Sequence, residues 1–197
     1  MAGAALAPAP AGAQADPAAV MPIRELCDGL ISIMRAGQAT PFARRYAMLT
    51  PAIERAFDLS AILQLSVGPS WSGLSPDQQA TLMTAFRRYT VANYVNSFDN
   101  YNGQHFDVVP DTKVLPNGEQ LAQTRIINSA GESHELDYVM RQIDGSWKAV
   151  DVLADGSISR VAVQRSDFRR LVSRGGAQAL IESLNQKTND LSGGALS

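Results

Sequence analysis

The chain of 197 residues carries 17 Lys and Arg against 19 Asp and Glu, and its formal net charge of −2 excludes nucleic acid as the main partner. Hydrophobic residues make up 45% and charged residues 18%, which is typical of a single globular domain and excludes disorder along the whole chain. The single cysteine, Cys27, excludes an internal disulfide framework and a cysteine-rich metal site.

The N-terminal segment over residues 1–19 is almost entirely Ala, Pro and Gly, and we expect it to be disordered. Residues 13–15, Ala-Gln-Ala, have the small-x-small form of a signal-peptidase site, which indicates the remnant of a signal peptide and export of the protein. The alternative interpretation is a plain Ala/Pro-rich tail. We expect one domain over residues 20–190 and a frayed tail over 191–197.

Helices are expected in the next part of the chain. Apolar residues at intervals of three and four predict a helix that begins near Pro22 and ends at Gly37. Cys27 lies on the apolar stripe of this helix, and we interpret it as a small buried hydrophobe. Thr-Pro pairs at residues 40–41 and 50–51 each combine an N-cap residue with Pro at the first helical position, which predicts two short helices in succession.

Two further helices have clear starting signals. Asp58 is positioned to cap a helix that ends at the Gly-Pro pair of residues 68–69. Ser75 and Gln78 form the pattern of a capping box and predict the start of the longest helix. The apolar sector of that helix is wide, which leaves two interpretations open: the helix passes through the middle of the domain, or one of its faces lines a cavity.

The period of the pattern changes to two after residue 103, which predicts strands over residues 104–110, 120–128, 134–143 and 146–153. Gly-containing turns separate these segments and predict an antiparallel meander. Strict alternation places Tyr138 and Met140 on one face of the third strand. In the fourth strand it places Val150 and Val152 on one face and Ala149 on the other.

Ser166 begins a closing helix that Gly175-Gly176 interrupts, and a last amphipathic segment follows over residues 177–184. The order of elements predicts an α+β fold. In this fold, N-terminal helices and a long central helix pack on a curved antiparallel sheet of about four strands, and C-terminal helices close the domain.

Several short stretches together resemble the toluene-tolerance/MlaC family of periplasmic lipid-shuttle proteins, over roughly residues 20–190. The stretches that carry the resemblance are Phe57-Asp58, Gly68 to Trp71, Phe86 to Tyr94, Tyr138, Trp147-Lys148, Asp151-Val152, Asp155-Gly156-x-Ile158-Ser159, Arg165 to Phe168, and Gly176 to Leu184. Residues 97–106 and 154–168 are most similar to the hopanoid-associated branch of the family, called HpnM.

The resemblance implies a soluble, monomeric periplasmic carrier without cofactor, metal or catalytic residues. Such a carrier holds a phospholipid or a hopanoid in an apolar cavity and passes it between inner-membrane transporter and outer-membrane lipid complexes. Retention needs no covalent chemistry, because each methylene removed from water contributes about 0.8 kcal/mol. The residues that we expect to line the cavity are Phe57, Ile62, Leu63, Trp71, Phe86, Tyr89, Tyr94, Tyr138, Met140, Val150, Val152 and Ile158.

The polar residues near these motifs have structural interpretations. We expect Asp151 either to form an ion pair with Arg165 or to cap the turn at residues 155–156. His105 and His134 lie beside strand starts, where we expect them to be exposed, and the sequence arranges no further ligands for a metal pair.

Two competing hypotheses belong to other classes. A small cone-shaped α+β enzyme, such as an isomerase or dehydratase, houses an acid–base site between its helices and a curved sheet. Asp137, Tyr138 and Asp151 are the only material for such a site, and alternation directs Asp137 and Tyr138 to opposite faces of their strand. The other hypothesis is a scaffold or adaptor without a ligand.

Overall fold

The computed structural model describes residues 15–196, so most of the Ala/Pro-rich N-terminal segment, with its signal-peptidase-like site, lies outside the described residues. Within the described part, the Asp16 carboxylate caps a short 3-10 helix, η1 (Pro17–Val20). The end of η1 is buried against the rest of the protein. The folded part therefore begins before the expected boundary at residue 20.

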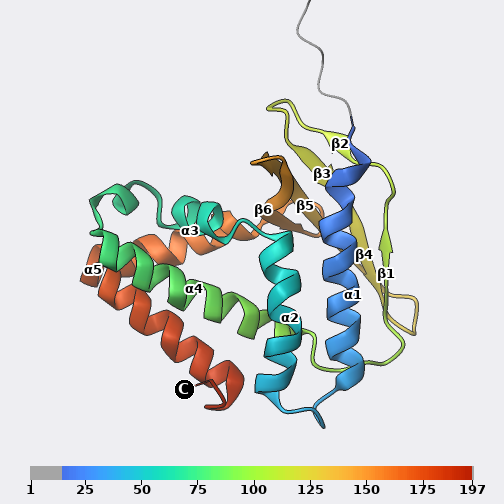
Figure 1. Ribbon diagram of the computed structural model, residues 1–197, viewed down its shortest axis with the longest axis horizontal. Coiled ribbons are helices and arrows are strands. Elements are labelled where there is room, and N and C mark those ends of the chain that lie inside the picture. The colour runs from blue at the N-terminus through green and yellow to red at the C-terminus, as the bar shows by residue number, and fades with distance from the viewer. Residues whose placement is uncertain (1–14, 197) are drawn as a thin grey trace, which may run out of the picture.

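Two antiparallel helices, α1 (Met21–Ala36) and α2 (Phe42–Ala56), run side by side in front of the sheet (Figure 1). Gly37 ends α1 as expected: its φ of 62° is a conformation that favours glycine, and its N–H donates to the Ile33 and Met34 carbonyls.

The second Thr-Pro pair does not start a new helix, which corrects the expectation of two short helices. α2 continues through Pro51, although proline has no N–H to donate to the preceding turn. The neighbouring Thr50 hydroxyl donates to the Tyr46 carbonyl at 2.8 Å, which adds a bond in the same turn but does not replace the backbone bond that Pro51 lacks. Leu49 and Ile53, both fully buried on either side of Pro51, hold this stretch against the core. Tertiary packing therefore outweighs the helix-breaking effect of Pro51.

The next helices begin where their caps predict. Asp58 accepts from the Ala61 N–H at 2.9 Å and starts α3 (Leu59–Val67), after which η2 (Gly68–Gly73) leads to α4 (Pro76–Ser97). Both hydrogen bonds of the expected capping box between Ser75 and Gln78 are present at the start of α4.

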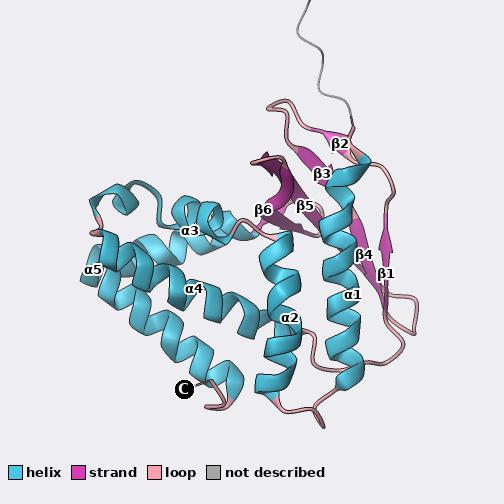
Figure 2. Ribbon diagram, viewed as in Figure 1, coloured by secondary structure: helices cyan, strands magenta, loops and turns pink. Residues whose placement is uncertain are grey.

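The sheet lies to one side of the helices and is antiparallel throughout (Figure 2). Its strands are β1 (His105–Val108), β2 (Lys113–Val114), β3 (Gln120–Ala122), β4 (Thr124–Ile127), β5 (Ser133–Ile143), β6 (Ser146–Ala154) and β7 (Ile158–Ser159). β3 and β4 together form the expected second strand, interrupted at Gln123, and both pair with β5. The predicted meander is confirmed, although its second strand is broken into two pieces and the short strands β2 and β7 are additional.

A β-bulge changes which side chains of β6 share a face. Ala149 pairs with Met140 and Val152 pairs with Tyr138, so Val150 is an extra residue without a partner in β5. Paired residues point to the same side of a sheet, and Ala149 and Val152 therefore share the face of Tyr138 and Met140. The expectation that Ala149 and Val152 lie on opposite faces was wrong, because simple alternation fails across a bulge.

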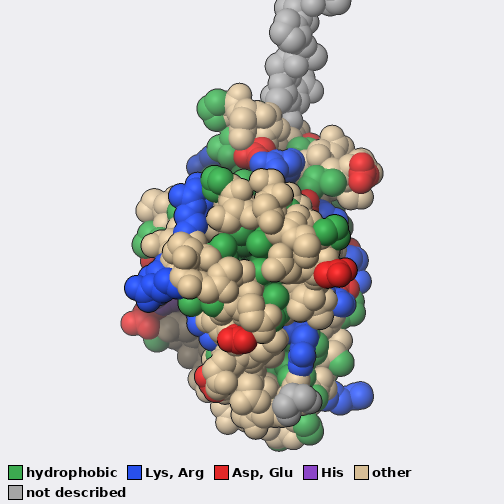
Figure 3. Space-filling view, turned by 90° about the vertical axis from the view of Figure 1, so that its left-hand side faces the viewer, with side chains coloured by type: hydrophobic (Ala, Val, Ile, Leu, Met, Phe, Trp, Pro, Cys, Tyr) green, Lys and Arg blue, Asp and Glu red, His purple; other side chains and the backbone are tan. Residues whose placement is uncertain are grey.

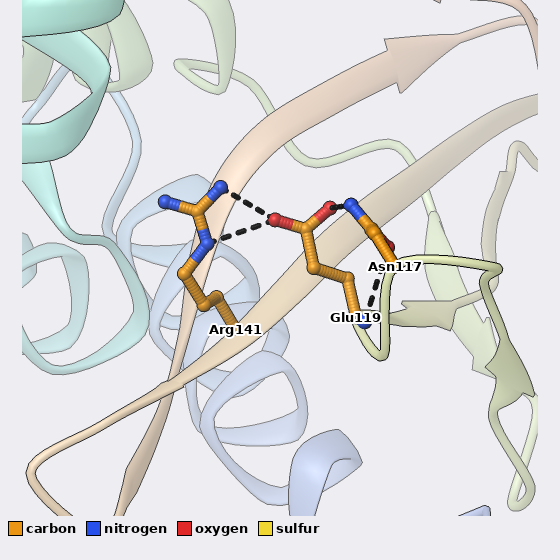
Figure 4. A network of polar contacts seen from close by, with 3 residues as sticks. All are labelled: Asn117, Glu119 and Arg141. Atoms are coloured by element: carbon orange, nitrogen blue, oxygen red, sulfur yellow. Dashed lines mark hydrogen bonds and ion pairs between the residues drawn. The ribbon is translucent and has the colours of Figure 1, made fainter. Parts of the chain in front are cut away.

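The turn between β2 and β3 is tied to the middle of the sheet by a small polar network (Figure 4). The Arg141 guanidinium donates twice to one carboxylate oxygen of Glu119, and the Asn117 amide donates to the other oxygen at 2.7 Å. Glu119 directly precedes β3 and Arg141 lies on β5, so these contacts tie the short β2–β3 hairpin to β5 in the observed register.

The last helix, α5 (Arg160–Ser192), consists of two limbs joined by a kink at Gly175 and Gly176, and the limbs form a V beside α4 (Figure 1). Gly176 has a φ of 64°, which explains why the kink carries glycine. The first limb begins six residues before the expected Ser166, because the Ser159 hydroxyl accepts from the Ala162 N–H and caps it.

The helices cover the inward face of the sheet and share one hydrophobic core with it. The α+β class and the layout of helices on a curved antiparallel sheet are as predicted. In the part of the chain that the structure describes, no helix combines the length and the apolar character that a bilayer crossing requires.

Candidate functional site: an apolar cavity between α4, α5 and the sheet

A cavity of about 430 Å³ lies between α4, both limbs of α5 and strands β5 and β6, and we call it the α4–α5 cavity. Its wall is mainly aromatic and aliphatic: Phe57, Leu59, Ile62, Phe86, Tyr89, Tyr94, Phe98, Leu136, Tyr138, Val152, Ala154, Val161, Val163 and Phe168. The polar lining residues are Thr90, Asn93, Ser97, Asp151, Arg160, Gln164, Asp167 and Lys187. An apolar wall with a few polar groups is typical of a small-molecule or lipid site.

One wall of the cavity is a row of aromatic rings anchored to the sheet. The Asp58 N–H donates to the Ala149 carbonyl at 3.0 Å and holds the adjacent Phe57 against β6. The Phe57 ring centroid lies 5.7 Å from that of Tyr94 and 6.1 Å from that of Tyr138. These separations are in the range of favourable aromatic pairs, so the rings support one another without filling the space beside them.

Two of these rings bring hydroxyl groups into an apolar environment. Burial raises the pKa of Tyr94 and Tyr138 above the ordinary tyrosine range, and both phenols are neutral at physiological pH. Tyr138 is only 1% exposed. Among the described residues, neither hydroxyl has a hydrogen-bond partner, which leaves both free to meet a polar group of a ligand or a water molecule.

The structure brings together seven of the twelve residues that the sequence predicted as lining: Phe57, Ile62, Phe86, Tyr89, Tyr94, Tyr138 and Val152. They come from α2–α3, α4 and the sheet, so segments far apart in sequence meet at one place. Their contact with a lipid remains a prediction.

The other five residues lie elsewhere. Leu63 and Met140 are fully buried among packed core residues, and Val150 is the bulge residue of β6. Trp71 is half-buried on η2, and Ile158 on the short strand β7 is 51% exposed. Apolar character alone could not separate core residues from lining residues.

Several lining residues were not recognised from the sequence. Thr90, Asn93 and Ser97 follow Phe86 at helical intervals of three and four, so the helical period was the signal that could have found them. Arg160 and Lys187 carried no such signal. They lie on different limbs of α5, and only the kink at residues 175–176 brings both limbs to the same cavity.

The Asp151 carboxylate is fixed by hydrogen bonds at the start of α5. It accepts from the Val152 and Val161 N–H groups at 2.7 and 3.1 Å and from the Ser159 hydroxyl. Arg165 donates to the Leu65 carbonyl at 3.0 Å. Both expectations for Asp151 were wrong, because its partners are the backbone and Ser159 at the start of α5. A carboxylate held this way joins β6 to α5.

The remaining reactive side chains do not assemble into a site. Asp137 is buried and accepts from the Gln123 amide at 3.1 Å. Cys27 is buried as expected, and burial raises the pKa of its thiol to about 12, which makes it unreactive. His105 and His134 are both exposed, as expected. Across residues 15–196, no group of His, Cys, Asp and Glu is arranged to hold a metal ion.

The surface at the helical end of the molecule carries charges of both signs. Basic and acidic side chains lie interspersed among polar and hydrophobic ones on this face (Figure 3). A mixed surface of this kind lacks the one-sided positive field that draws a nucleic-acid backbone.

Comparisons with known proteins agree with this architecture. A family model described as "MlaC protein" matches residues 24–186. A phospholipid-binding protein from Ralstonia solanacearum, solved in complex with a phospholipid, superposes with a TM-score of 0.75 at 19% sequence identity, covering 88% of this chain and 98% of that one. None of the curated proteins matches the chain.

Proposed function

The chain belongs to the MlaC family, and on this premise we propose that it is a periplasmic carrier that holds a phospholipid by its acyl chains in the α4–α5 cavity. The family consists of non-enzymatic lipid-binding carriers, so the enzyme hypothesis is set aside. The environment of Asp151 agrees with this, because its carboxylate already accepts hydrogen bonds at the start of α5.

The α4–α5 cavity is the observation that carries the proposal. Each methylene that enters it from water contributes about 0.8 kcal/mol, and the aromatic and aliphatic wall supplies the dispersion contacts. The Ralstonia solanacearum protein of the same fold was solved with a phospholipid, which supports an acyl-chain ligand for this chain as well. Binding energy then depends on buried area, which suits a carrier that must later release its lipid.

The transport role follows from the family. MlaC proteins are generally periplasmic, and we propose that this chain works there as a monomer. It would receive its lipid at one membrane complex and deliver it at another, between an inner-membrane transporter and an outer-membrane lipid complex. The cavity shields the chains during transit.

A hopanoid is the second candidate ligand, and a specific segment favours it. Residues 154–168, which are most similar to the HpnM branch, form β7 and the start of α5. Within this segment Arg160, Val161, Val163 and Phe168 line the cavity. The segment on which the resemblance to the hopanoid-associated branch rests therefore contributes to the wall of the cavity.

Native mass spectrometry of protein purified without detergent tests the proposal. We expect a mass increment that organic extraction identifies as an unmodified phospholipid or hopanoid. Val152→Trp, which adds bulk at the cavity wall, should lower the bound fraction. Val109→Trp adds the same bulk at an exposed position and should leave it unchanged. Wild-type protein without any bound lipid, under conditions where lipid is offered in vesicles, would contradict the proposal.

A further inference from the structure

Two cationic side chains line the α4–α5 cavity from opposite limbs of α5. Arg160 stands at the start of the first limb and Lys187 lies within the second, and both are exposed. The Lys187 ammonium lies over the Tyr89 ring, 5.8 Å from its centroid. The charge of Arg160 also acts on Tyr89, where it opposes the rise in pKa that burial causes. Both cations therefore lie near the same ring of the cavity wall.

The two cationic side chains have no anionic partner, whereas the acidic side chains of the same wall are already engaged. Asp151 accepts hydrogen bonds from the start of α5, and Asp167 forms an ion pair with Arg170 at 3.0 Å. Within residues 15–196, neither the Arg160 guanidinium nor the Lys187 ammonium has a hydrogen bond or an ion pair. The two carboxylates are engaged in hydrogen bonds or an ion pair, so the charged side chains of the wall that remain available to a ligand are the two cations.

We propose that Arg160 and Lys187 form a binding site for the phosphate of a lipid headgroup whose acyl chains occupy the α4–α5 cavity. This inference rests on the proposed carrier function and deepens it by naming the headgroup chemistry. A guanidinium and an ammonium that line the same cavity suit a phosphate ester, which has several acceptor oxygens. Their exposure places the phosphate at the solvent edge, while the aromatic row beyond it receives the chains.

The two cations also predict an order of preference among lipids, which follows the charge of the headgroup. A lipid with a net negative headgroup, such as phosphatidylglycerol, gains from both cations. Phosphatidylethanolamine gains less, because its own ammonium offsets part of the field. Diacylglycerol, which has no phosphate, gains nothing from the pair and depends on the apolar wall alone.

The test compares loading of lipids with identical acyl chains into the delipidated protein. In Arg160→Gln combined with Lys187→Gln, loading of phosphatidylglycerol should fall by about three- to tenfold, while loading of diacylglycerol should stay at the wild-type level. Arg174→Gln is the control, because it removes a charge from the same limb about 21 Å along the helix axis from Arg160 and does not line the cavity.

Equal loading of phosphatidylglycerol by the double variant and the wild type would overturn the headgroup site and leave the carrier function intact. Failure of wild-type protein to take up either lipid would instead contradict the carrier function itself. Inorganic phosphate alone should not raise the melting temperature of the delipidated protein. A rise that the double variant lacks, combined with unchanged lipid loading, would assign the two cations to a free anion and overturn the lipid assignment.

Discussion

The α1–α2 pair and the wall of the α4–α5 cavity both contain fully buried apolar side chains but use them differently. Leu30 and Leu49 on the first pair of helices are fully buried against other side chains. Phe86 and Tyr138 are 1% exposed, yet they border a cavity of about 430 Å³. Burial alone therefore does not identify a binding site. The difference lies in whether neighbouring side chains fill the space beside a buried residue.

The largest effect on stability is expected from truncating a packed side chain of the α1–α2 pair. Leu30→Ala should lower the free energy of unfolding by about 2–5 kcal/mol, because it opens a new cavity among packed side chains. Leu136→Ala in the lipid-free protein should cost clearly less, because Leu136 already borders open space. Urea unfolding of both variants measures the difference. Equal losses would show that the wall of the α4–α5 cavity is as tightly packed as the α1–α2 pair.

Adding bulk should separate the two kinds of buried residue. Met140 is fully buried and outside the cavity wall, so Met140→Trp should overpack the core and cost about 1–3 kcal/mol. Val152→Trp should keep the wild-type melting temperature of the lipid-free protein and reduce the bound lipid. Thermal melts and lipid counts on both variants decide. A stable Met140→Trp protein with less lipid would place Met140 at the ligand.

Alkaline pH should lower the stability of the folded protein through the buried tyrosines of the cavity wall. The pKa of Tyr138 is raised in the folded state by burial, whereas the unfolded chain releases this proton near pH 10. The contribution of this group to stability is therefore constant below about pH 10 and is lost as the pH rises above it, by up to about 1.4 kcal/mol per pH unit for each such group. Unfolding of Tyr138→Phe should show a shallower decline, and an identical slope would contradict this account.

A smaller loss is expected at the junction between the sheet and α5. Asp151→Asn removes the carboxylate that accepts from two backbone N–H groups and Ser159, and should cost about 1 kcal/mol. Lipid occupancy should not change, because the side chain supports the fold and takes no part in proton transfer. Chemical denaturation and extracted-lipid counts on the same sample provide the measurement. Loss of lipid without loss of stability would assign Asp151 to the ligand.

Local signals predicted much of the fold. The caps at Asp58 and Ser75 and the stop at Gly37 are hydrogen-bonding and backbone effects confined to a few residues, and each was confirmed. Pro51 was misread because the buried residues on both sides of it outweigh its local effect. The bulge at Val150 was missed because it depends on pairing between strands.

The cavity was harder to predict than the fold. Seven of the expected lining residues meet there, and the helical period of α4 brings six of its residues to one wall. Met140 and Leu63 could not be told apart from lining residues, since a packed and an unpacked buried side chain have the same sequence signature. Arg160 and Lys187 meet only through the kink in α5.

Photo-crosslinking with a phospholipid that carries a diazirine near the end of an acyl chain tests most directly whether the α4–α5 cavity holds the ligand. Peptide mapping should place the label on the α4 face between Phe86 and Phe98 and on the β5 and β6 residues around Tyr138 and Val152. The α1 peptides, whose apolar residues are packed in the core, should remain unlabelled. Labelling concentrated on α1 and α2, or labelling that excess unlabelled phospholipid does not compete away, would contradict the account.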